Sequence, residues 1–347
     1  MRIAFVVDRF RPGKGGLERW LGAFGEHLAA RGDEVSVVSM DRDVPPPFTH
    51  LRIAPRGLTR VRRDRGFAEA AAVACAQAGF DVVAGLRHCL SCTVYVPHGG
   101  SAAAAFAGER GSPRARNFVA LERALLDGPS PPKRILAVSE AVRRDLAARY
   151  PAIAPAIRVV PNGVDLGRFT PEGREQARAA LAPAGGRVLL FLAANPRLKG
   201  VATAKRVFEV LRARGAADLL LLAGGRPGRL REGMRWLGHL TRPEEAYRAA
   251  DLLLLPTRYD PFPLALLESL ACGTPVATTE ANGALDHVGR TGPVRAVEDP
   301  GDVGEFARLS AEMLAGAPRA EARALAERFD LGRSFDAAAA VFRESAG

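Results

Sequence analysis

The sequence predicts an α/β protein of two doubly wound, Rossmann-like domains that face each other across a cleft. The chain has 347 residues, which is too long for a single ordinary hydrophobic core. Its N-terminus reads strand, glycine-rich loop, helix, strand, and the same alternation restarts near residue 187. Strands that are joined through helices lie parallel, so each half is expected to form a parallel sheet covered by helices.

The first half opens with an apolar strand over residues 2–7. A glycine-rich loop, Pro12–Gly16, leads into a helical pattern of apolar residues at 17–28, and a second strand follows at 34–39. Further strands are predicted from the apolar runs at 80–84, 93–96 and 135–138.

The second half repeats this pattern. Its strands are predicted at 187–192, 218–223, 251–255 and 275–279. The turn Pro161-Asn-Gly163 separates the two series and is the expected hinge, and the Ala-rich tail at 303–347 has a helical composition. We therefore expect one domain over 1–160, a second over 161–330, and a helix over 331–347 that packs back on the first domain.

The composition is that of a soluble globular protein, with 48% hydrophobic and 25% charged residues. No apolar run approaches the ~20 residues that a membrane-spanning helix needs. The apolar run at the N-terminus is too short for a signal peptide. These features favour a cytoplasmic protein.

The formal net charge is +11, and it is concentrated in the first half. Up to residue 160 there are 24 basic and 15 acidic residues. Arginines cluster at Arg52, Arg56, Arg60, Arg62, Arg63 and Arg65, and again at Arg110, Arg114, Arg116 and Arg123. This asymmetry indicates an anionic partner such as a membrane surface, a phosphorylated acceptor or nucleic acid, while a solvated arginine-rich surface explains it equally well.

The four cysteines do not form a disulfide framework or a metal site. Cys89 and Cys92 make a C-x-x-C pattern beside His88, but a zinc site needs a second pair of ligands at matching spacing. Small core thiols are the better interpretation, and no metal site is predicted.

One short helix carries an unusual acid. The stretch from Asp260 to Thr279 places Asp260 in a Pro-rich loop, then an almost wholly apolar helix with one acid, Glu268, and ends that helix at Gly273. A helix that is apolar nearly all round is buried, so Glu268 must be paired or bound to a ligand unless it lies at a solvated edge.

Other polar loops follow predicted strands, where ligands bind in doubly wound sheets. Arg197 and Lys199 are suited to holding a diphosphate, and the Gly15-Gly16 pair brings backbone amides and a helix N-terminus to an anion. His98 lies between a strand and two glycines that leave room for a ligand. Asn282 and Gly283 follow the strand at 275–279 and could present backbone amides. Each signal alone also fits an ordinary loop.

Taken in order, these motifs resemble the retaining GT-B glycosyltransferases of family 4, especially bacterial enzymes of the lipopolysaccharide-core type. The resemblance covers essentially the whole chain. It rests on Gly15-Gly16, His98-Gly-Gly, Val159-Val-Pro-Asn-Gly-Val-Asp165, Arg197-Leu-Lys199-Gly200, Leu237-Gly-His239, Ala249-Ala-Asp251-Leu-Leu-Leu-Leu-Pro256 and Asp260-x7-Glu268.

The resemblance implies a role for each matching residue. Glu268 would bind the donor ribose, Asp260 would hold hydroxyls of the transferred sugar, and His98 would contact that sugar near its reacting face. Arg197 and Lys199 would neutralise the diphosphate leaving group. The remaining donor-binding residues implied by the resemblance are Gly15, Gly16, His239, Phe262, Leu264, Asn282 and Gly283. The catalytic set would be His98, Asp260, Arg197 and Lys199.

Two positions depart from the family pattern. Asp260 stands where the family usually has Glu, which puts the identity of the sugar in doubt. Pro263 stands where the family usually has Gly, so one backbone donor is missing.

The resemblance implies transfer of a sugar, with retention, from a nucleoside-diphosphate donor, with UDP favoured, to a glycan or lipid-linked acceptor in bacterial envelope synthesis. No cofactor or metal is expected, because Arg197 and Lys199 would do what a metal otherwise does. The basic first half would touch the anionic inner face of the membrane peripherally, and no nucleic-acid partner is expected. The alternatives are a nucleotide-dependent oxidoreductase or epimerase, which the missing dinucleotide fingerprint disfavours, and a catalytically weak protein that binds anionic surfaces.

Overall fold

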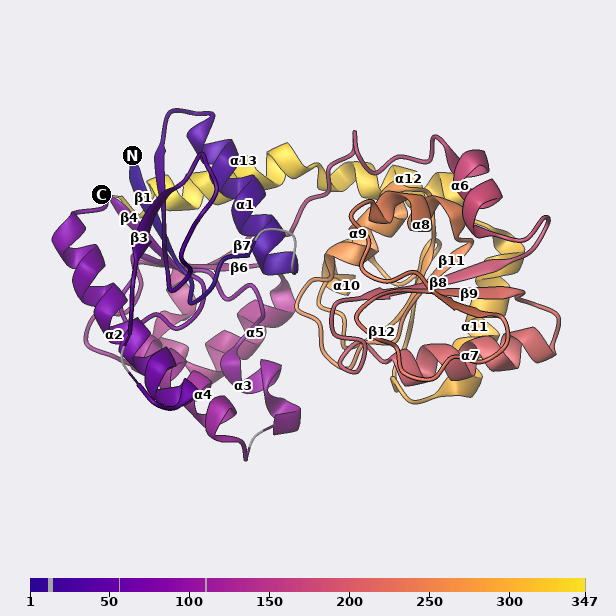
Figure 1. The fold of residues 1–347 in the computed structure, drawn as a ribbon, viewed down its shortest axis with the longest axis horizontal. Coiled ribbons are helices and arrows are strands. Elements are labelled where there is room, and N and C mark those ends of the chain that lie inside the picture. Colours follow the sequence, from indigo (N-terminus) through magenta and orange to yellow (C-terminus); the bar gives the residue numbers. More distant parts are fainter. Residues whose placement is uncertain (12–14, 56, 110, 347) are drawn as a thin grey trace. The chain divides into compact units, whose positions relative to one another are not determined.

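A computed structural model describes residues 1–11, 15–55, 57–109 and 111–346. These residues form two compact units (Figure 1). Unit 1 contains residues 1–160 and 335–347, and unit 2 contains residues 161–334. The predicted fold class, two parallel-sheet α/β domains, is confirmed.

Unit 1 is built on a seven-stranded parallel sheet in the order β3-β2-β1-β4-β5-β6-β7. Its strands are β1 (Arg2–Val6), β2 (Glu34–Ser39), β3 (Thr49–Arg52), β4 (Val82–Gly85), β5 (Val94–Tyr95), β6 (Arg134–Ala137) and β7 (Ile157–Val159). Its helices before residue 160 are α1 (Gly16–Ala29), α2 (Arg60–Ala78), α3 (Ala102–Ala105), α4 (Pro113–Leu126) and α5 (Glu140–Arg149), with 3-10 turns η1 (Ala107–Glu109) and η2 (Pro151–Ala156). The strand order reverses between β1 and β4, which makes the carboxyl ends of these strands the expected ligand edge.

The core of unit 1 includes residues far apart in the sequence. In Figure 1 the yellow helix α13 (Leu331–Arg343) lies beside the indigo helix α1. Phe342 packs against Phe5 and Phe24 with ring centroids 5.9 and 5.3 Å apart, and Phe335 lies 5.3 Å from Phe24. Burying one such side chain contributes about 1.5–3 kcal/mol.

Unit 2 is built on a six-stranded parallel sheet in the order β10-β9-β8-β11-β12-β13. Its strands are β8 (Val188–Ala193), β9 (Leu219–Gly224), β10 (Met234–Trp236), β11 (Leu252–Leu255), β12 (Val276–Thr279) and β13 (Val294–Val297). Its helices are α6 (Arg174–Leu181), α7 (Val201–Ala213), α8 (Pro243–Ala249), α9 (Leu264–Ala271), α10 (Leu285–Val288), α11 (Val303–Gly316) and α12 (Arg319–Ala326), with the 3-10 turn η3 (Glu327–Phe329).

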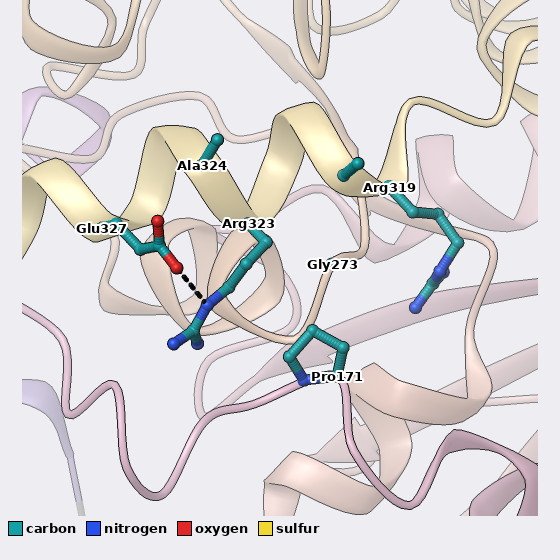
Figure 2. Close-up of a pocket in the computed structure, with 7 residues that line it drawn as sticks. Pro171, Gly273, Arg319, Arg323, Ala324 and Glu327 are labelled. Carbon is teal, nitrogen blue, oxygen red and sulfur yellow. Dashed lines mark hydrogen bonds and ion pairs between the residues drawn. The ribbon is translucent and has the colours of Figure 1, made fainter.

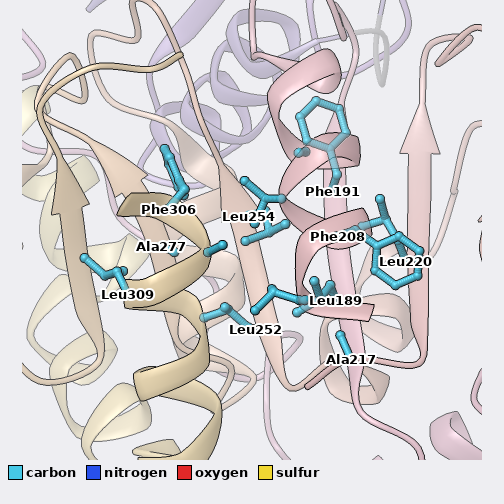
Figure 3. Close-up of a cluster of buried hydrophobic side chains, with 14 of the residues drawn as sticks. Leu189, Phe191, Phe208, Ala217, Leu220, Leu252, Leu254, Ala277, Phe306 and Leu309 are labelled. Carbon is cyan, nitrogen blue, oxygen red and sulfur yellow. The ribbon is translucent and has the colours of Figure 1, made fainter. Parts of the chain in front are cut away.

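Helices cover both faces of this second sheet. Helices α7 and α11 pack together on one face, and α6, α8, α9 and α12 lie on the other (Figure 1). Figure 3 shows the core under α7 and α11, where Leu189, Phe208, Leu254 and Phe306 interdigitate and are fully buried. The strand order reverses between β8 and β11, so their carboxyl ends form the ligand edge of unit 2.

The long apolar strands agree with the sequence prediction to within two residues, but four short strands were missed. β3 and β10 are half exposed, so they carry no apolar run. β7 immediately precedes the predicted hinge at 161–163, and Arg295 interrupts the apolar run of β13. The helical tail is divided into three helices. Ala317 adopts a left-handed backbone (φ 41°) before Pro318 and separates α11 from α12, and the turn η3 followed by the extended residue Asp330 separates α12 from α13.

Two further expectations concern the whole chain. All four cysteines are buried free thiols, which confirms their interpretation as core residues. None of the helices described is both long enough and apolar enough to cross a membrane.

Candidate functional site

Two oppositely charged residues, in the loops that follow neighbouring strands, lie close together at the ligand edge of unit 2. The Lys199 ammonium, in the loop after β8, forms an ion pair with the Asp260 carboxylate, in the loop after β11. The same ammonium also donates to the carbonyl of Tyr259 at 3.4 Å. Gly200 permits this approach, because a Cβ there would collide with the carbonyl oxygen of Pro256, and its backbone is left-handed (φ 78°).

Asp260 is held in place by the loop that follows β12. Its amide donates to the carbonyl of Ala281 at 3.1 Å, and its own carbonyl accepts from Gly283 at 2.8 Å. The carboxylate is buried, with 7% of the residue exposed. Burial raises the pKa of Asp260, and the Lys199 charge opposes that rise. Asp260 is therefore fixed and partly neutralised before any ligand arrives.

In the loop at 280–284 the backbone amides of residues 282–284 are already hydrogen-bonded, so they do not offer the free donors that the sequence suggested. The backbone amide of Asn282 donates to the carbonyl of Thr279 at 3.1 Å, and that of Gly283 donates to the carbonyl of Asp260. The backbone amide of Ala284 donates to the side-chain oxygen of Asn282 at 3.0 Å, and the side-chain nitrogen of Asn282 donates to the Thr278 hydroxyl at 3.1 Å. Asn282 and Gly283 thus lie beside Asp260, but their donors support the loop itself.

Helix α9 carries the second acid. Glu268 is buried, as its apolar helix predicts, with 5% of the residue exposed. The Tyr247 hydroxyl, from helix α8, donates to Glu268 Oε2 at 2.8 Å. Tyr247 is fully buried and was not predicted from the sequence, because a single tyrosine in a helix carries no local signal of its partner.

The N-terminus of α9 is uncapped by any side chain. Pro263 occupies the cap position and has no side-chain hydrogen-bond acceptor. The amides of Leu264 and Ala265 therefore lack an intrahelical partner, whereas that of Leu266 donates to the Pro263 carbonyl at 3.1 Å. Phe262 is buried, its ring lies 5.9 Å from that of His287, and its carbonyl accepts from Asn162 at 3.4 Å. Phe262 therefore supports the loop, whereas Leu264 begins a helix end that is suited to an anion.

Two predicted donor-binding residues lie on the surface of unit 2. Arg197 is exposed, and its guanidinium has no ion pair or hydrogen bond within the described ranges. His239 is also exposed. It follows Gly238, whose carbonyl accepts from Gly224 at 2.7 Å, so His239 lies near the carboxyl end of β9.

His98 occupies the loop after β5 in unit 1. Its ring lies 5.3 Å from that of Trp20, on α1. Burial lowers the pKa of His98 to about 4, so the imidazole is neutral at pH 7. Gly99 leaves open space beside it, since a Cβ there would have no neighbour within 4 Å.

The glycine-rich loop is only partly described. Residues 12–14 of the predicted Pro12–Gly16 loop lie outside the described residues, as do Arg56 and Arg110 of the arginine clusters. Gly15 is extended and precedes the first residue of α1, Gly16, without a side-chain cap. Both glycines lie at the ligand edge of unit 1, after β1.

A cavity of about 340 Å³ lies at the other end of α9, around Gly273, and no predicted site residue lines it (Figure 2). Arg323 is ion-paired with Glu327 at 3.0 Å and donates to the carbonyl of Ala271 at 3.1 Å. Arg319 donates to the carbonyl of Cys272 at 3.1 Å. These guanidinium groups cap the C-terminus of α9 and are structural.

Within the residues described, no group of three or more His, Cys, Asp or Glu side chains is arranged to hold a metal ion. Independence from metals stays a prediction for experiment.

Comparisons with known proteins agree with this geometry. Residues 14–168 match the model of Glycosyltransferase Family 4, and residues 186–315 match that of Glycosyl transferases group 1. Both halves of the chain thus match models of glycosyltransferases of the group 1/family 4 type, and its two parallel-sheet units have the GT-B fold.

Curated relatives and solved structures are consistent with this class. D-inositol 3-phosphate glycosyltransferase of Arthrobacter sp. (strain FB24) is 34% identical over 53% of this chain and 48% of its own length. The enzyme of the same name from Saccharomonospora viridis is 35% identical over 60% of this chain and 55% of its own. The chain thus spans about half the length of the curated relatives it matches.

The solved structures show the fold over nearly the full chain. WaaG, a glycosyltransferase involved in lipopolysaccharide biosynthesis, superposes with a TM-score of 0.84 at 22% identity, covering 98% of this chain and 99% of WaaG. Anabaena HepE in complex with UDP-glucose superposes with a TM-score of 0.73 at 17% identity, covering 99% of this chain and 100% of HepE.

Proposed function

We propose that this protein transfers a sugar from a nucleoside-diphosphate donor to an acceptor hydroxyl, with retention at the anomeric carbon. The observation that carries the proposal is the meeting of Lys199 and Asp260 at the ligand edge of unit 2. The uncapped start of α9 lies just beyond Asp260, and the free Arg197 guanidinium just before Lys199. These groups suit a diphosphate and a polyhydroxyl group side by side.

Each residue has one role in the proposed reaction. Glu268 accepts hydrogen bonds from the ribose hydroxyls, and Tyr247 fixes the orientation of that carboxylate. Asp260 binds hydroxyls of the transferred sugar. Arg197, Lys199 and the first amides of α9 bind the diphosphate.

The chemistry needs charge stabilisation more than acid or base catalysis. The bond between the anomeric carbon and the diphosphate oxygen breaks as a bond to the acceptor oxygen forms, and the acceptor hydroxyl releases its proton. Negative charge accumulates on the departing diphosphate, where Arg197 and Lys199 stabilise it. We propose that His98, which is neutral at pH 7, contacts the sugar without adding a third positive charge.

The proposed donor carries UDP, and the proposed acceptor is a glycan or lipid-linked sugar of the bacterial envelope. The UDP-glucose complex of Anabaena HepE supports the base, and WaaG supports the acceptor class. A second acceptor, an inositol phosphate, is favoured by the curated relatives, which are named D-inositol 3-phosphate glycosyltransferases. A phosphorylated acceptor also agrees with the basic first half of the chain.

We further propose that unit 1 touches an anionic membrane surface peripherally, at the cytoplasmic face. Three exposed arginines, Arg62, Arg63 and Arg65, lie in the first turns of α2, and Leu58, just before this helix, is 96% exposed. Basic residues beside an exposed apolar side chain suit anionic headgroups. Sedimentation with phosphatidylglycerol vesicles, but not with phosphatidylcholine vesicles, is expected, and replacing the three arginines with glutamine should abolish it.

A donor panel tests the enzymatic proposal. UDP-, GDP- and ADP-sugars are screened by thermal shift, since a ligand that binds only the folded state raises Tm. Donors that bind are then assayed with glycan, lipid-linked and inositol phosphate acceptors, and the anomeric configuration of the product is read by NMR. NAD(P) binding without nucleotide-sugar binding would favour the oxidoreductase or epimerase alternative, and no nucleotide binding would favour the surface-binding alternative.

A further inference from the structure

A buried carboxylate outside the predicted site holds the loop that carries His98. Glu122 lies on helix α4 of unit 1, and only 4% of the residue is exposed. Neither the motifs nor the proposed chemistry uses it. A carboxylate buried to this degree is costly unless donors surround it, so its partners show what it does for the structure.

Three donors converge on Glu122. Oε2 accepts from the Tyr95 hydroxyl at 3.0 Å and from the Ala102 amide at 2.8 Å. Oε1 accepts from the Tyr150 hydroxyl at 3.3 Å. One carboxylate oxygen therefore joins the end of strand β5 to the start of helix α3.

The segment between these two anchors is the His98 loop, residues 96–101. Tyr95 immediately precedes it, and Ala102 immediately follows it. Inside the loop Gly99 and Gly100 leave the backbone few side-chain constraints, and Gly100 has a left-handed backbone (φ 78°). Ser101 adds a second tether through its hydrogen bond to Asp145. A glycine-rich loop of this kind keeps one geometry only if its ends are fixed.

We propose that Glu122 is a positioning residue for the His98 loop, acting by anchoring both of its ends. It does not contact the substrate. It keeps the imidazole against Trp20, and this sets where the ring meets the transferred sugar. The catalytic consequence rests on the proposed function, whereas the structural anchoring does not.

The loop position is read in the free protein by fluorescence. The sequence has two tryptophans, so Trp236→Phe leaves Trp20, which lies 5.3 Å from His98, as the single reporter. A protonated imidazole quenches this fluorescence. In the Trp236→Phe protein the quench should have a midpoint at pH about 4. Glu122→Ala should move it toward the ordinary histidine value of 6.5, since the released loop exposes the ring to water.

Three further variants separate anchoring from simple destabilisation. Glu122→Gln keeps an oxygen for Tyr95 and Ala102 and should retain the low midpoint. Tyr150→Phe removes only the donor outside the loop and should also retain it. Tyr95→Phe removes one anchor alone and should shift the midpoint upward, which provides a test if Glu122→Ala does not fold. An unchanged midpoint in both Tyr95→Phe and a folded Glu122→Ala overturns the proposal.

Kinetics then test the catalytic consequence. A loop displaced by about 1 Å lowers kcat on the order of 100-fold. Glu122→Ala should therefore lose kcat while donor KM changes little, and Glu122→Gln should recover most of the activity. Equal kcat in folded Glu122→Ala and in the wild type contradicts this role. Absence of any transfer by the wild type contradicts the proposed function instead, and leaves the fluorescence result valid.

Discussion

The hydroxyl of Tyr247 donates to Oε2 of Glu268 at 2.8 Å, between two helices of unit 2. Both side chains are buried, so the bond helps to fix which way the carboxylate points. A carboxylate fixed in this way meets a ligand without reorganising, which is how preorganised sites gain affinity.

Tyr247→Phe should weaken donor binding without abolishing it. Removing one hydrogen bond from a buried carboxylate costs about 1–3 kcal/mol, or roughly 5- to 150-fold in affinity if the loss falls on the donor complex. Isothermal titration with the donor identified by the panel measures this. The matched control is Tyr150→Phe, which removes a tyrosine hydroxyl from a buried carboxylate in unit 1 and should leave donor affinity unchanged. Equal affinity losses in the two variants would contradict the assignment.

Lys199 and Asp260 should behave as a coupled pair. Lys199→Met removes the cation that stabilises the diphosphate, and kcat should fall by about 100- to 1000-fold. The same change leaves Asp260 buried without its partner, so Asp260→Asn in the Lys199→Met background should cost much less than it does alone. Strictly additive losses across this double-mutant cycle would show that the pair does not act as a unit.

Asp260→Glu should change which sugar is used. The longer side chain restores the acid that the family usually carries and moves the carboxylate by about one methylene. The ratio of kcat/KM between UDP-glucose, UDP-galactose and UDP-N-acetylglucosamine measures the effect. An unaltered ratio would remove Asp260 from the sugar-binding role.

His98 should make the stability of the protein depend on pH. Its folded pKa, about 4, lies below the ordinary value of 6.5, so the unfolded chain binds the proton more tightly. The stability associated with neutral His98 is therefore complete above pH 6.5 and is lost as the pH falls from 6.5 through 4. Urea denaturation across this range should show that the free energy of unfolding falls more steeply with decreasing pH in the wild type than in His98→Gln. Parallel plots of that free energy against pH would refute the depressed pKa.

Transfer should persist in a chelator. We predict equal rates in excess EDTA and in added Mg²⁺ or Mn²⁺, because Arg197 and Lys199 supply the positive charge. A strict requirement for either ion would require a different account of the leaving group.

Local sequence was enough to find the residues that lie in loops at strand ends. Lys199 and Asp260 each follow an apolar run, and the carboxyl ends of parallel strands meet at one edge of the sheet. Their direct ion pair was not predictable, because it joins residues 61 positions apart.

The supporting residues could not be found in this way. Tyr247 and Glu122 lie on helices and act on partners about 20 residues or more away, so neither leaves a pattern in its own neighbourhood. The prediction of free amides in the loop at 280–284 was wrong for a different reason. Its glycine suggested free amides, but Asp260 and Asn282 accept the hydrogen bonds of that loop.

Helix α13 belongs to both units, with Leu331–Ser334 in unit 2 and Phe335–Arg343 in unit 1. Domains generally fold in order as they leave the ribosome, the N-terminal one first. Here unit 2 has all of its residues once position 334 has been translated, whereas unit 1 must wait for Phe335 and Phe342 to reach Phe24. The unit whose synthesis starts first is thus the one that completes its core last.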